Sequence, residues 1–579
     1  MSATSAASNA GAPTVRHLFR NFWRIAKPYW VSEDKFYAWG LLALVISLSL
    51  GMVYMNVQFN SWYNEFYNTL QNLDAKGFKE ALYKFGYLAF LYIVIAVYAV
   101  WFQQMLEIRW RKWATIHYTQ KWLNENNFYR LQLTDQDTDN PDQRIAEDVG
   151  QFVSISLSLS LGLLRSVVTL VSFIGILWTL SGPLKFMLGG SEVSIPGYMV
   201  WVAIIYALIG TGITILLGRP LVGLNFMQQR YEADFRFGLV RVRENAESIA
   251  LYGGAKDEQE RLGYRFVNVV SNFWSLMRMN KRLTWFTSFW GQLAIIFPLI
   301  VAAPRFFAKE IPLGGLMQIN SAFGQVYGAL DFIIGSFSTL ANWKAVIDRL
   351  TTFERSIEVA DQLPRIEPQP IVQGLQLSHL SVSKPNGEVL LSNVNLSLKA
   401  GDTLLIRGKS GTGKSSLLRA MAGIWPYAQG QYGLQGNTRS LFLSQKPYMP
   451  LGSLRAALYY PNVAEQDDEK IGDLLALAGL SHLMPRLDEV DAWSHVLSLG
   501  EQQRIALLRA ILVKPDFLLM DESTSALDAD GEAILYAAVR EAMKGGVMIS
   551  VGHRAGLVEY HQQVLECQGQ GRWELGALA

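Results

Sequence analysis

The chain has 579 residues, of which 50% are hydrophobic and only 17% are charged, and its mean hydropathy is +0.15. This apolar excess is too high for an ordinary soluble enzyme and too low for a chain made of membrane helices alone, so we expect one membrane part and one soluble part. The formal net charge of +2 gives no reason to expect a nucleic-acid partner, and the single cysteine, Cys567, excludes an internal disulfide and a cysteine-rich metal site.

The first thirty residues combine a tail and a basic helix. Residues 1–13 are rich in Ala and Ser, lack the basic-then-apolar pattern of a signal peptide, and are predicted to be disordered. From Val15 to Trp30, cationic residues recur at helical spacing among large apolar ones. We expect this helix to lie in the membrane interface, although a surface helix of a soluble domain has the same pattern.

Six segments are apolar enough to cross a bilayer, which takes about 20 such residues. They lie at about 36–59, 85–106, 166–184, 193–218, 283–304 and 311–330, and they predict an all-α transmembrane domain over residues 31–355. Polar residues follow one another at the outer end of the first span, among them Asn60 and Asn64. They could line a wet cavity or lie among the outer headgroups, and the pattern fits both.

The basic residues are concentrated in two long connections, after the second and the fourth span, whereas the other connections are short. Because positive charge near helix ends stays on the cytoplasmic side, we expect both long connections and both termini to be cytoplasmic.

After Arg355 the pattern changes. Residues 356–374 are predicted to be a linker, and residues 375–579 contain no spanning segment. Short apolar strands alternate there with helical stretches, which predicts an α/β domain with a largely parallel sheet. The expected strands are Thr403–Ile406, Leu441–Ser444, Phe517–Met520 and Val547–Val551.

A phosphate-binding loop follows the first of these strands. The run Gly408-Lys409-Ser410-Gly411-Thr412-Gly413-Lys414-Ser415 fits G-x-x-x-x-G-K-[ST] and leads into a helix that begins at Ser416. Glycines let backbone N–H groups turn toward phosphates, and the helix N-terminus favours anions. We expect Lys414 to contact the β- and γ-phosphates of ATP and Ser415 to bind Mg²⁺.

A second signal is the strand that ends in Asp521 and Glu522. An edge strand ending in two solvated acids would have the same sequence, but the position about a hundred residues after a phosphate loop favours a catalytic role. We expect Asp521 near the metal and Glu522 to act as general base for the attacking water.

The run Leu497-Ser498-Leu499-Gly500-Glu501-Gln502-Gln503-Arg504 resembles the signature of ABC transporter ATPases, usually L-S-G-G-Q. Gln445 resembles that family's Q-loop and His553 its switch histidine, although a lone histidine is more often a packed or surface residue. Ser525-Ala526-Leu527-Asp528 resembles the D-loop. The resemblance implies an ATP hydrolase with catalytic, nucleotide-binding and metal-binding positions. The catalytic residues would be Glu522, His553 and Lys414. The nucleotide would be bound by residues 408–416, Gln445, Ser498, Gly500, Glu501 and Asp528. The metal ion would be bound by Ser415, Gln445 and Asp521.

Two positions depart from the family pattern. The third signature position is Leu499 in place of glycine, and the aromatic residue that usually stacks on adenine is missing near Val382 to Lys384. In the family, the signature of one subunit faces the phosphate loop of another. One copy of each motif therefore implies a homodimer of half-transporters, coupled through cytoplasmic helices expected near Ala114–Trp122 and Arg230–Arg241.

The membrane half narrows the resemblance. The stretches Asn60–Tyr67, Asp139–Ile145 and Arg243–Gly254 resemble the YddA and SbmA/BacA-like group with a fused ATPase, which is related to the peroxisomal fatty-acyl transporters. This implies a multi-pass protein of the bacterial inner membrane that moves peptides or other hydrophilic solutes, including cobalamin-like ones, inward. Its partners would be a second copy, the lipid bilayer and the solute. The alternatives are an exporter of lipids or fatty acyl-CoA and an ATP-gated channel or regulator.

Overall fold

The computed structural model describes residues 15–134, 140–188, 191–435 and 438–578. The tail predicted to be disordered, residues 1–13, lies outside the described residues. The chain forms two compact units, which are described separately. The first, called the helical unit, comprises Met1–Thr119 and Asn140–Phe353, and the second, called the α/β unit, comprises Gln120–Asp139 and Glu354–Ala579.

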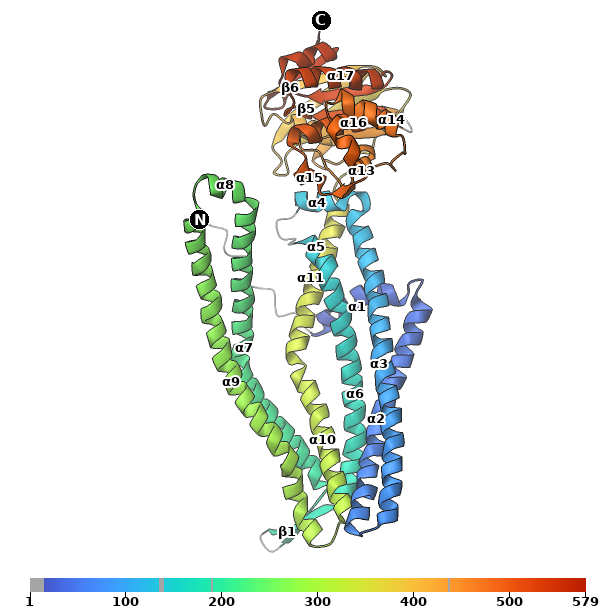
Figure 1. Ribbon diagram of the computed structural model, residues 1–579, viewed down its shortest axis with the longest axis vertical. Coiled ribbons are helices and arrows are strands. Elements are labelled where there is room, and N and C mark those ends of the chain that lie inside the picture. The colour runs from blue at the N-terminus through green and yellow to red at the C-terminus, as the bar shows by residue number, and fades with distance from the viewer. Residues whose placement is uncertain (1–14, 135–139, 189–190, 436–437, 579) are drawn as a thin grey trace. The chain divides into compact units, whose positions relative to one another are not determined.

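The helical unit is built from long helices (Figure 1). They are α1 (Val15–Trp30), α2 (Lys35–Gln71), α3 (Ala75–Leu123), α5 (Pro141–Gln143), η2 (Arg144–Asp148), α6 (Val149–Ser181), α7 (Tyr198–Glu244), α8 (Ala246–Leu251), α9 (Ala255–Phe307), α10 (Leu313–Gly335) and α11 (Phe337–Asp361). Helices α7 and α9 run side by side, and α8 joins them (Figure 1). The two long connections predicted from the sequence are thus mostly helical.

Five helical stretches among the described residues are long and apolar enough to cross a membrane: 35–71, 75–134, 141–181, 198–244 and 255–307. The sixth expected segment, 311–330, falls largely in α10. In the most apolar part of α3 only 11% of the residues are buried within the chain. That exposed apolar surface calls for a bilayer or a second chain to cover it. The prediction of a helical membrane region followed by an α/β domain is confirmed.

A β-hairpin that the sequence analysis did not predict connects α6 to α7. Its strands, β1 (Pro183–Leu188) and β2 (Ser191–Pro196), pair antiparallel. The expected spans 166–184 and 193–218 each include a few residues of this hairpin. Gly182 and Gly197 flank it with φ of 59° and 62°, conformations that end one helix and begin the next.

Helix α1 packs on its own unit through aromatic rings. Tyr29 stacks on Trp110 of α3 with ring centroids 5.5 Å apart, and Phe22 contacts Phe152 of α6 and Trp343 of α11. Basic residues such as Arg20 and Lys27 lie on its exposed side. The helix is therefore amphipathic, as predicted. Protein covers part of its apolar face, whereas Phe19 and Trp23 are more than half exposed.

Helix α10 lies at the centre of the helical core, packed against α6, α7 and α9. It also pairs with the polar residues of α2. The amide of Asn60 donates to the backbone carbonyl of Gln318 (3.0 Å), and the Gln318 amide donates back to Asn60 Oδ1 (3.1 Å). Asn64 donates to Gln318 Oε1 (2.7 Å), and Asn68 accepts from the backbone N–H of Gly314. These polar residues of the first span therefore bind α10.

The α/β unit contains one mixed six-stranded sheet and one smaller four-stranded sheet. The six-stranded order is β14-β13-β6-β12-β11-β8, in which only β14 is antiparallel to its neighbour. The strands are β3 (Gln369–Ile371), β4 (Leu375–Ser383), β5 (Val389–Leu398), β6 (Thr403–Gly408), β7 (Ala428–Gln435), β8 (Ser440–Leu443), β9 (Gly452–Ser453), β10 (Val490–Asp491), β11 (Phe517–Asp521), β12 (Val547–Val551), β13 (Gln563–Gly569) and β14 (Arg572–Ala577). The largely parallel sheet predicted from the sequence is confirmed.

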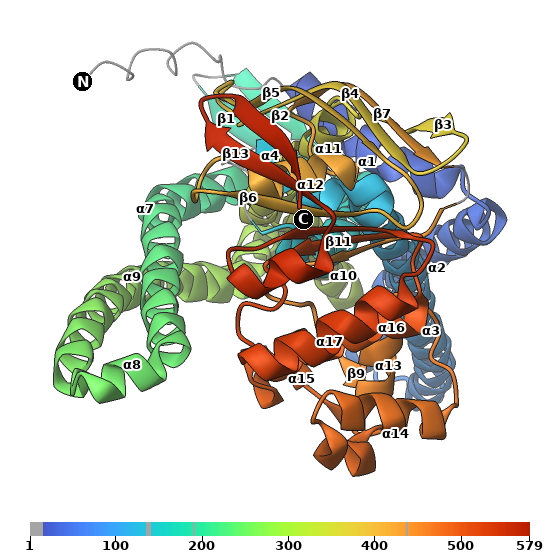
Figure 2. The same ribbon diagram turned by 90° about the horizontal axis from the view of Figure 1, so that it is seen from above.

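Helices and the smaller sheet cover the two faces of the six-stranded sheet. Along β11, Leu518 and Met520 face the core under α13, α14, α16 and α17, whereas Phe517 and Leu519 face the core shared with α12, β4, β5 and β7. Figure 2 shows α14, α16 and α17 on one side and β4, β5 and β7 on the other. Burial on both faces explains why these strands are continuous apolar runs. The helices are η1 (Asn124–Asn126), α4 (Asn127–Thr134), α12 (Lys414–Met421), α13 (Leu454–Tyr459), α14 (Asp468–Leu477), η3 (Ser481–Arg486), α15 (Trp493–Val496), α16 (Leu499–Val513), α17 (Ala529–Ala542) and η4 (Ala555–Tyr560).

The linker expected at residues 356–374 is shorter in the structure. Helix α11 continues to Asp361 and β3 begins at Gln369, which leaves 362–368 between them. The α/β unit also includes α4, which the sequence analysis assigned to the membrane half.

Candidate nucleotide site at the carboxyl edge of the sheet

Three parallel strands end at the same edge of the six-stranded sheet, and each is followed by predicted site residues. Strand β6 leads into the phosphate loop and α12, β11 ends at Asp521, and β12 is followed by His553. Loops at the carboxyl ends of parallel strands are where α/β proteins bind ligands. The sheet order therefore gathers residues that are more than a hundred positions apart in sequence.

Two glycines of the phosphate loop are required by their surroundings. Gly408 has φ of 141°, and a Cβ there would lie 2.3 Å from the carbonyl oxygen of Cys567 on β13. Gly413 has φ of 99°, and its Cβ would lie 2.8 Å from Leu390 Cβ. Any side chain at either position would push β13 or β5 away from the loop. Between them, Lys409, Ser410 and Gly411 are exposed, and Thr412 Oγ1 donates to the Lys409 carbonyl (2.9 Å).

Lys414 is the first residue of α12, and its side chain turns back to the start of the loop. Its ammonium donates to the carbonyl oxygens of Gly408 (2.8 Å) and Lys409 (2.9 Å), and the residue is only 6% exposed. A buried cation held by backbone carbonyls at a helix N-terminus is suited to contact anionic phosphate oxygens. Ser416 follows on the same helix and is half-buried.

Ser415 and Asp521 are in direct contact, as expected for a shared metal site. Ser415 Oγ donates to Asp521 Oδ1 at 3.0 Å. Burial raises the pKa of the Asp521 carboxyl, and this outweighs the hydrogen bond from Ser415, which lowers it. A hydroxyl and a carboxylate beside phosphate oxygens are the ligands that Mg²⁺ prefers. The residues present therefore fit Mg²⁺.

Glu522 lies between Gln445 and His553, which the sequence analysis also assigned to the site. Gln445 Nε2 donates to Glu522 Oε2 (3.2 Å), and His553 Nε2 lies 3.5 Å from Glu522 Oε1. The Glu522 backbone has φ of 47°, a left-handed conformation, and its N–H donates to the carbonyl of Val551 on β12. This arrangement turns the Glu522 carboxylate toward both the Q-loop and the histidine.

The signature residues lie at the start of α16. Ser498 caps this helix, and Glu501 accepts hydrogen bonds from the Ser498 backbone N–H (2.8 Å) and hydroxyl (2.9 Å). Burial raises the pKa of Glu501, but these two hydrogen bonds, together with the charges of His482 and Arg504, hold it below its usual value. A Cβ at Gly500 would lie 3.0 Å from the carbonyl of Ala526, and Leu499 is 43% exposed. In the part of the chain that the structure describes, no hydrogen bond or ion pair joins these residues to Lys414 or Ser415.

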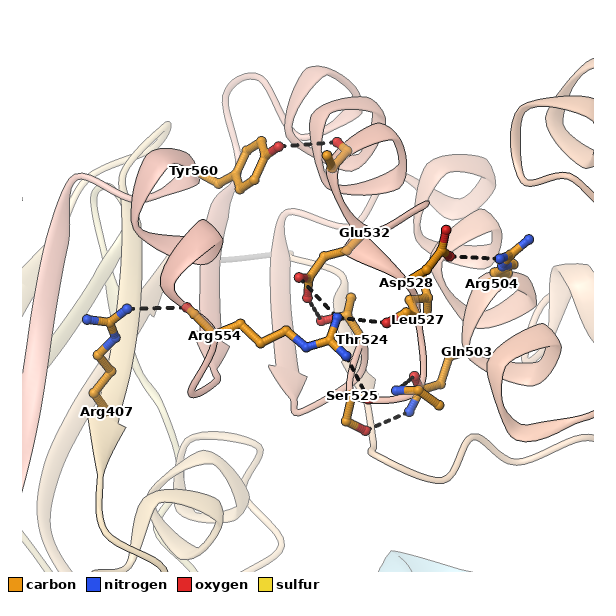
Figure 3. A network of polar contacts seen from close by, with 12 residues as sticks. Arg407, Gln503, Arg504, Thr524, Ser525, Leu527, Asp528, Glu532, Arg554 and Tyr560 are labelled. Atoms are coloured by element: carbon orange, nitrogen blue, oxygen red, sulfur yellow. Dashed lines mark hydrogen bonds and ion pairs between the residues drawn. The ribbon is translucent and has the colours of Figure 1, made fainter. Parts of the chain in front are cut away.

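The D-loop is held from two sides by residues that the sequence analysis did not select. Gln503 of α16 donates to Ser525 Oγ (3.1 Å) and accepts from the backbone N–H of Ala526 (2.9 Å). From the opposite side, Arg554 donates to the carbonyls of Ser525 (3.0 Å) and Leu527 (2.7 Å), as Figure 3 shows. Gln503 belongs to the signature run, and Arg554 directly follows His553. Their position next to predicted residues is the feature of the sequence that could have identified them.

The end of the D-loop is fixed by a second arginine and a buried acid. Asp528 accepts from Arg504 Nη2 (3.1 Å) and begins α17 (Figure 3). Glu532, one turn further along, accepts from Thr524 Oγ1 and from Arg554 (3.3 Å).

The region where an adenine-stacking aromatic was expected contains other interactions. Val382 is fully buried, and the Ser383 carbonyl accepts from Trp425 Nε1 (2.9 Å). Lys384 forms an ion pair with Glu388 (2.9 Å) across the β4–β5 turn.

Of the two segments expected to carry coupling helices, the first lies within a long helix. Residues 114–122 are inside α3, which continues to Leu123; the chain then turns at Glu125 and Asn126, which have φ of 50° and 62°. Helix α4 follows, and its Leu133 carbonyl accepts from the Tyr427 hydroxyl (3.1 Å) while its side chain packs on the β-sheet core. The helical periodicity of the sequence continues across this turn, so the sequence did not reveal where α3 ends. The second expected segment, Arg230–Arg241, lies inside α7. The chain turns after that segment, at α8, which joins α7 to α9.

Two family models match the chain: "ABC transporter transmembrane region 2" over residues 25–307 and "ABC transporter" over residues 391–525. The inner membrane ABC transporter ATP-binding protein YddA of Escherichia coli K12 is 33% identical over 94% of this chain and 96% of its own length. The chloroplastic ABC transporter D family member 2 of Arabidopsis thaliana is 35% identical over 96% of this chain and 87% of its own. The human lysosomal cobalamin transporter ABCD4 is 30% identical over 96% of each.

Proposed function

Since the chain belongs to the ABC transporters, as a half-transporter with one membrane region and one ATPase domain, we propose that two copies bind ATP between them and hydrolyse it to move a hydrophilic solute. The solutes that we propose are peptides and cobalamin-like compounds, moved inward across a bacterial inner membrane. Both termini then lie on the cytoplasmic side with the ATPase domain.

The observation that carries the homodimer is the separation of two motifs within one chain. The phosphate loop lies at the carboxyl edge of the sheet, whereas Ser498 and Gly500 lie at the start of α16, where they contact their own helix and the D-loop. A second copy can bring its own Ser498 and Gly500 to the phosphates held at Lys414. A symmetric pair completes two such sites at once.

Within each site the residues divide the chemistry among them. Lys414 and the loop N–H groups bind the phosphates, while Ser415, Asp521 and Gln445 would hold Mg²⁺, which supplies charge neutralisation at the phosphates. The Glu522 carboxylate accepts a proton from the attacking water, and His553 orients the γ-phosphate.

The proposed cargo rests on relatives and on the sequence resemblance. A relative that matches 96% of this chain is named for cobalamin transport. The stretches shared with the SbmA/BacA-like group add peptides as a second hydrophilic class.

The test is uptake into proteoliposomes. We expect accumulation of a labelled peptide or cobalamin that depends on ATP and is lost in Glu522→Gln, because that substitution removes the base. Uptake unchanged in this variant would contradict an ATP-driven mechanism. ATPase stimulation by fatty acyl-CoA but by neither hydrophilic class would instead support the lipid exporter, and flux that stops at equal concentrations would support a channel.

A second experiment tests the site itself. Lys414→Ala removes the cation that faces the phosphates, so ATP hydrolysis should fall to background. Near-normal turnover would refute the assignment of the phosphate loop.

A further inference from the structure

Gln503 connects three segments of the ATPase domain through one buried side chain. It belongs to α16, and its side chain has no exposed surface. Its amide nitrogen donates to the backbone carbonyl of Gln445 (2.8 Å) and to Ser525 Oγ (3.1 Å), and its amide oxygen accepts from Ala526 N–H (2.9 Å). Figure 3 shows this side chain directed at the D-loop. A single amide thus joins the signature helix, the Q-loop and the D-loop.

The segments joined by Gln503 serve different ATP molecules in the proposed dimer. The Gln445 side chain contacts Glu522, so the Q-loop belongs to the site of its own copy. Ser498, five residues before Gln503 and the cap of the same helix, faces the ATP of the partner copy. Gln503 is therefore placed between the two sites.

The D-loop is held from two sides, so the segments joined by Gln503 have little freedom to move independently. Arg554 holds the carbonyls of Ser525 and Leu527 from the side opposite to Gln503. Gln503 itself has no exposed surface, so breaking its bonds would leave a buried amide without partners, which costs about 1–3 kcal/mol. Movement of the Q-loop should therefore shift α16 rather than be absorbed by the D-loop.

We propose that Gln503 is a positioning residue that couples the two ATP sites, so that ATP bound at one site raises the affinity of the other. This inference rests on the proposed function, because it requires a dimer with shared sites. Couplings between binding sites are commonly about 5- to 150-fold in affinity. Coupling of this kind would let the dimer bind both ATP molecules together.

The experiment uses the full-length dimer in lipid nanodiscs and a non-hydrolysable ATP analogue, with binding followed by calorimetry. Gln503→Met keeps the side-chain volume and removes all three hydrogen bonds. Gln502→Met is the matched control, because Gln502 is adjacent, 4% exposed, and donates only to the carbonyls of Ser494 (3.0 Å) and Leu497 (2.8 Å) just before it.

In the wild type and in Gln502→Met, we expect the second analogue to bind at least about fivefold more tightly than the first. In Gln503→Met the two affinities should become equal, while two analogues still bind per dimer. Should Gln503→Met not fold, Gln503→Glu supplies the same comparison, because it retains the acceptor for Ala526 and loses the donor to Gln445.

Three outcomes would overturn the inference: unchanged coupling in the Gln503 variants, equal loss in Gln502→Met, or a wild-type dimer that hydrolyses ATP with two independent sites. In the last case the proposed function stands and only the coupling fails. A chain that hydrolyses ATP at full rate as a monomer would instead refute the shared sites themselves.

Discussion

The guanidinium of Arg130 donates from Nε to the carbonyl oxygen of Ala360, 2.8 Å away, and from Nη2 to the carbonyl of Leu363. Arg130 lies on α4 and is 3% exposed; Ala360 lies in the last turn of α11, and Leu363 lies just after that helix. The last carbonyls of a helix have no partner within it. Arg130 adds a donor to the Ala360 carbonyl, which also accepts from the Leu363 N–H (3.3 Å), and it pairs with the Leu363 carbonyl. It ties the helix that contacts Tyr427 to the segment that leads into the ATPase domain.

We predict that Arg130→Met will uncouple transport from ATP hydrolysis. Loss of both hydrogen bonds leaves the Leu363 carbonyl without this donor and should lower stability by about 1–3 kcal/mol. Because the substitution touches none of the predicted nucleotide-binding residues, we expect hydrolysis to fall less than solute uptake. The measurement is the ratio of solute moved to ATP hydrolysed in proteoliposomes.

Arg365→Met is the control for this prediction, since Arg365 is more exposed and pairs with Asp361 and Glu125 near the same helix end. Exposed ion pairs contribute about 0–1 kcal/mol. A ratio unchanged in Arg130→Met, or one equally reduced in Arg365→Met, would contradict a specific role for Arg130.

The parts of the fold that the sequence predicted are those encoded locally. Continuous apolar runs identify spanning helices and buried strands, and the order of short motifs from Gly408 to His553 identifies the ATPase. Each span, strand or motif is itself a run of no more than about 20 neighbouring residues.

The contacts that the sequence did not predict join distant segments. Asn60 and Gln318 are 258 positions apart, and Arg130 and Ala360 are 230 apart. In neither pair does the neighbouring sequence indicate whether the polar side chain contacts a buried partner, water or lipid. Similarly, Gln503 stands in a recognisable run, but only the fold shows that its amide meets the Q-loop.

A buried charge cluster in the helical unit gives a prediction on stability. Asp148 accepts two hydrogen bonds from Arg349 of α11 (2.8 and 2.7 Å) and pairs with Arg144, and its side chain is 3% exposed. Asp148→Asn removes the negative charge between two arginines. Removing one partner of a buried ion pair costs about 3–5 kcal/mol, so we expect a clearly lower unfolding temperature in detergent.

The neighbouring pair Lys344–Asp348 is the matched control for this cluster. It is also an ion pair at 2.6 Å on α11, but its side chains are 42% and 45% exposed. Asp348→Asn should therefore change stability by less than about 1 kcal/mol. Equal effects of the two substitutions would show that the Asp148 cluster is not specially stabilising.

The polar contact between α2 and α10 should show strong coupling in a double-mutant cycle. Asn60→Leu leaves the Gln318 amide N–H without its acceptor, and Gln318→Met leaves Asn60 Oδ1 without its donor while Asn60 keeps its bond to the backbone carbonyl at position 318. An unpaired buried polar group costs about 1–3 kcal/mol. In the double variant both partners of this side-chain hydrogen bond are removed, so the loss of stability should be smaller than the sum of the losses in the two single variants. Thermal unfolding of the four proteins measures this, and additive losses would argue against direct pairing.

His561 should make the ATPase domain less stable in mild acid. Its Nδ1–H donates to the Leu557 carbonyl (2.7 Å) and its Nε2 accepts from the Ser550 hydroxyl (2.8 Å), so the buried ring is held neutral. Burial lowers the pKa of His561 from 6.5 to about 4. As the pH falls from 6.5 toward 4, the unfolded chain binds a proton that the folded domain does not, and stability is lost by at most about 3 kcal/mol.

The unfolding temperature of the ATPase transition, followed from pH 7.5 to pH 5, measures this loss. His561→Phe should be less stable at pH 7.5, because Ser550 and Leu557 lose their partner, and its unfolding temperature should depend less on pH, because the titrating group is gone. The comparison therefore depends on the slope and not on the absolute stability. If both proteins lose stability in parallel as the pH falls, other groups must cause the acid sensitivity.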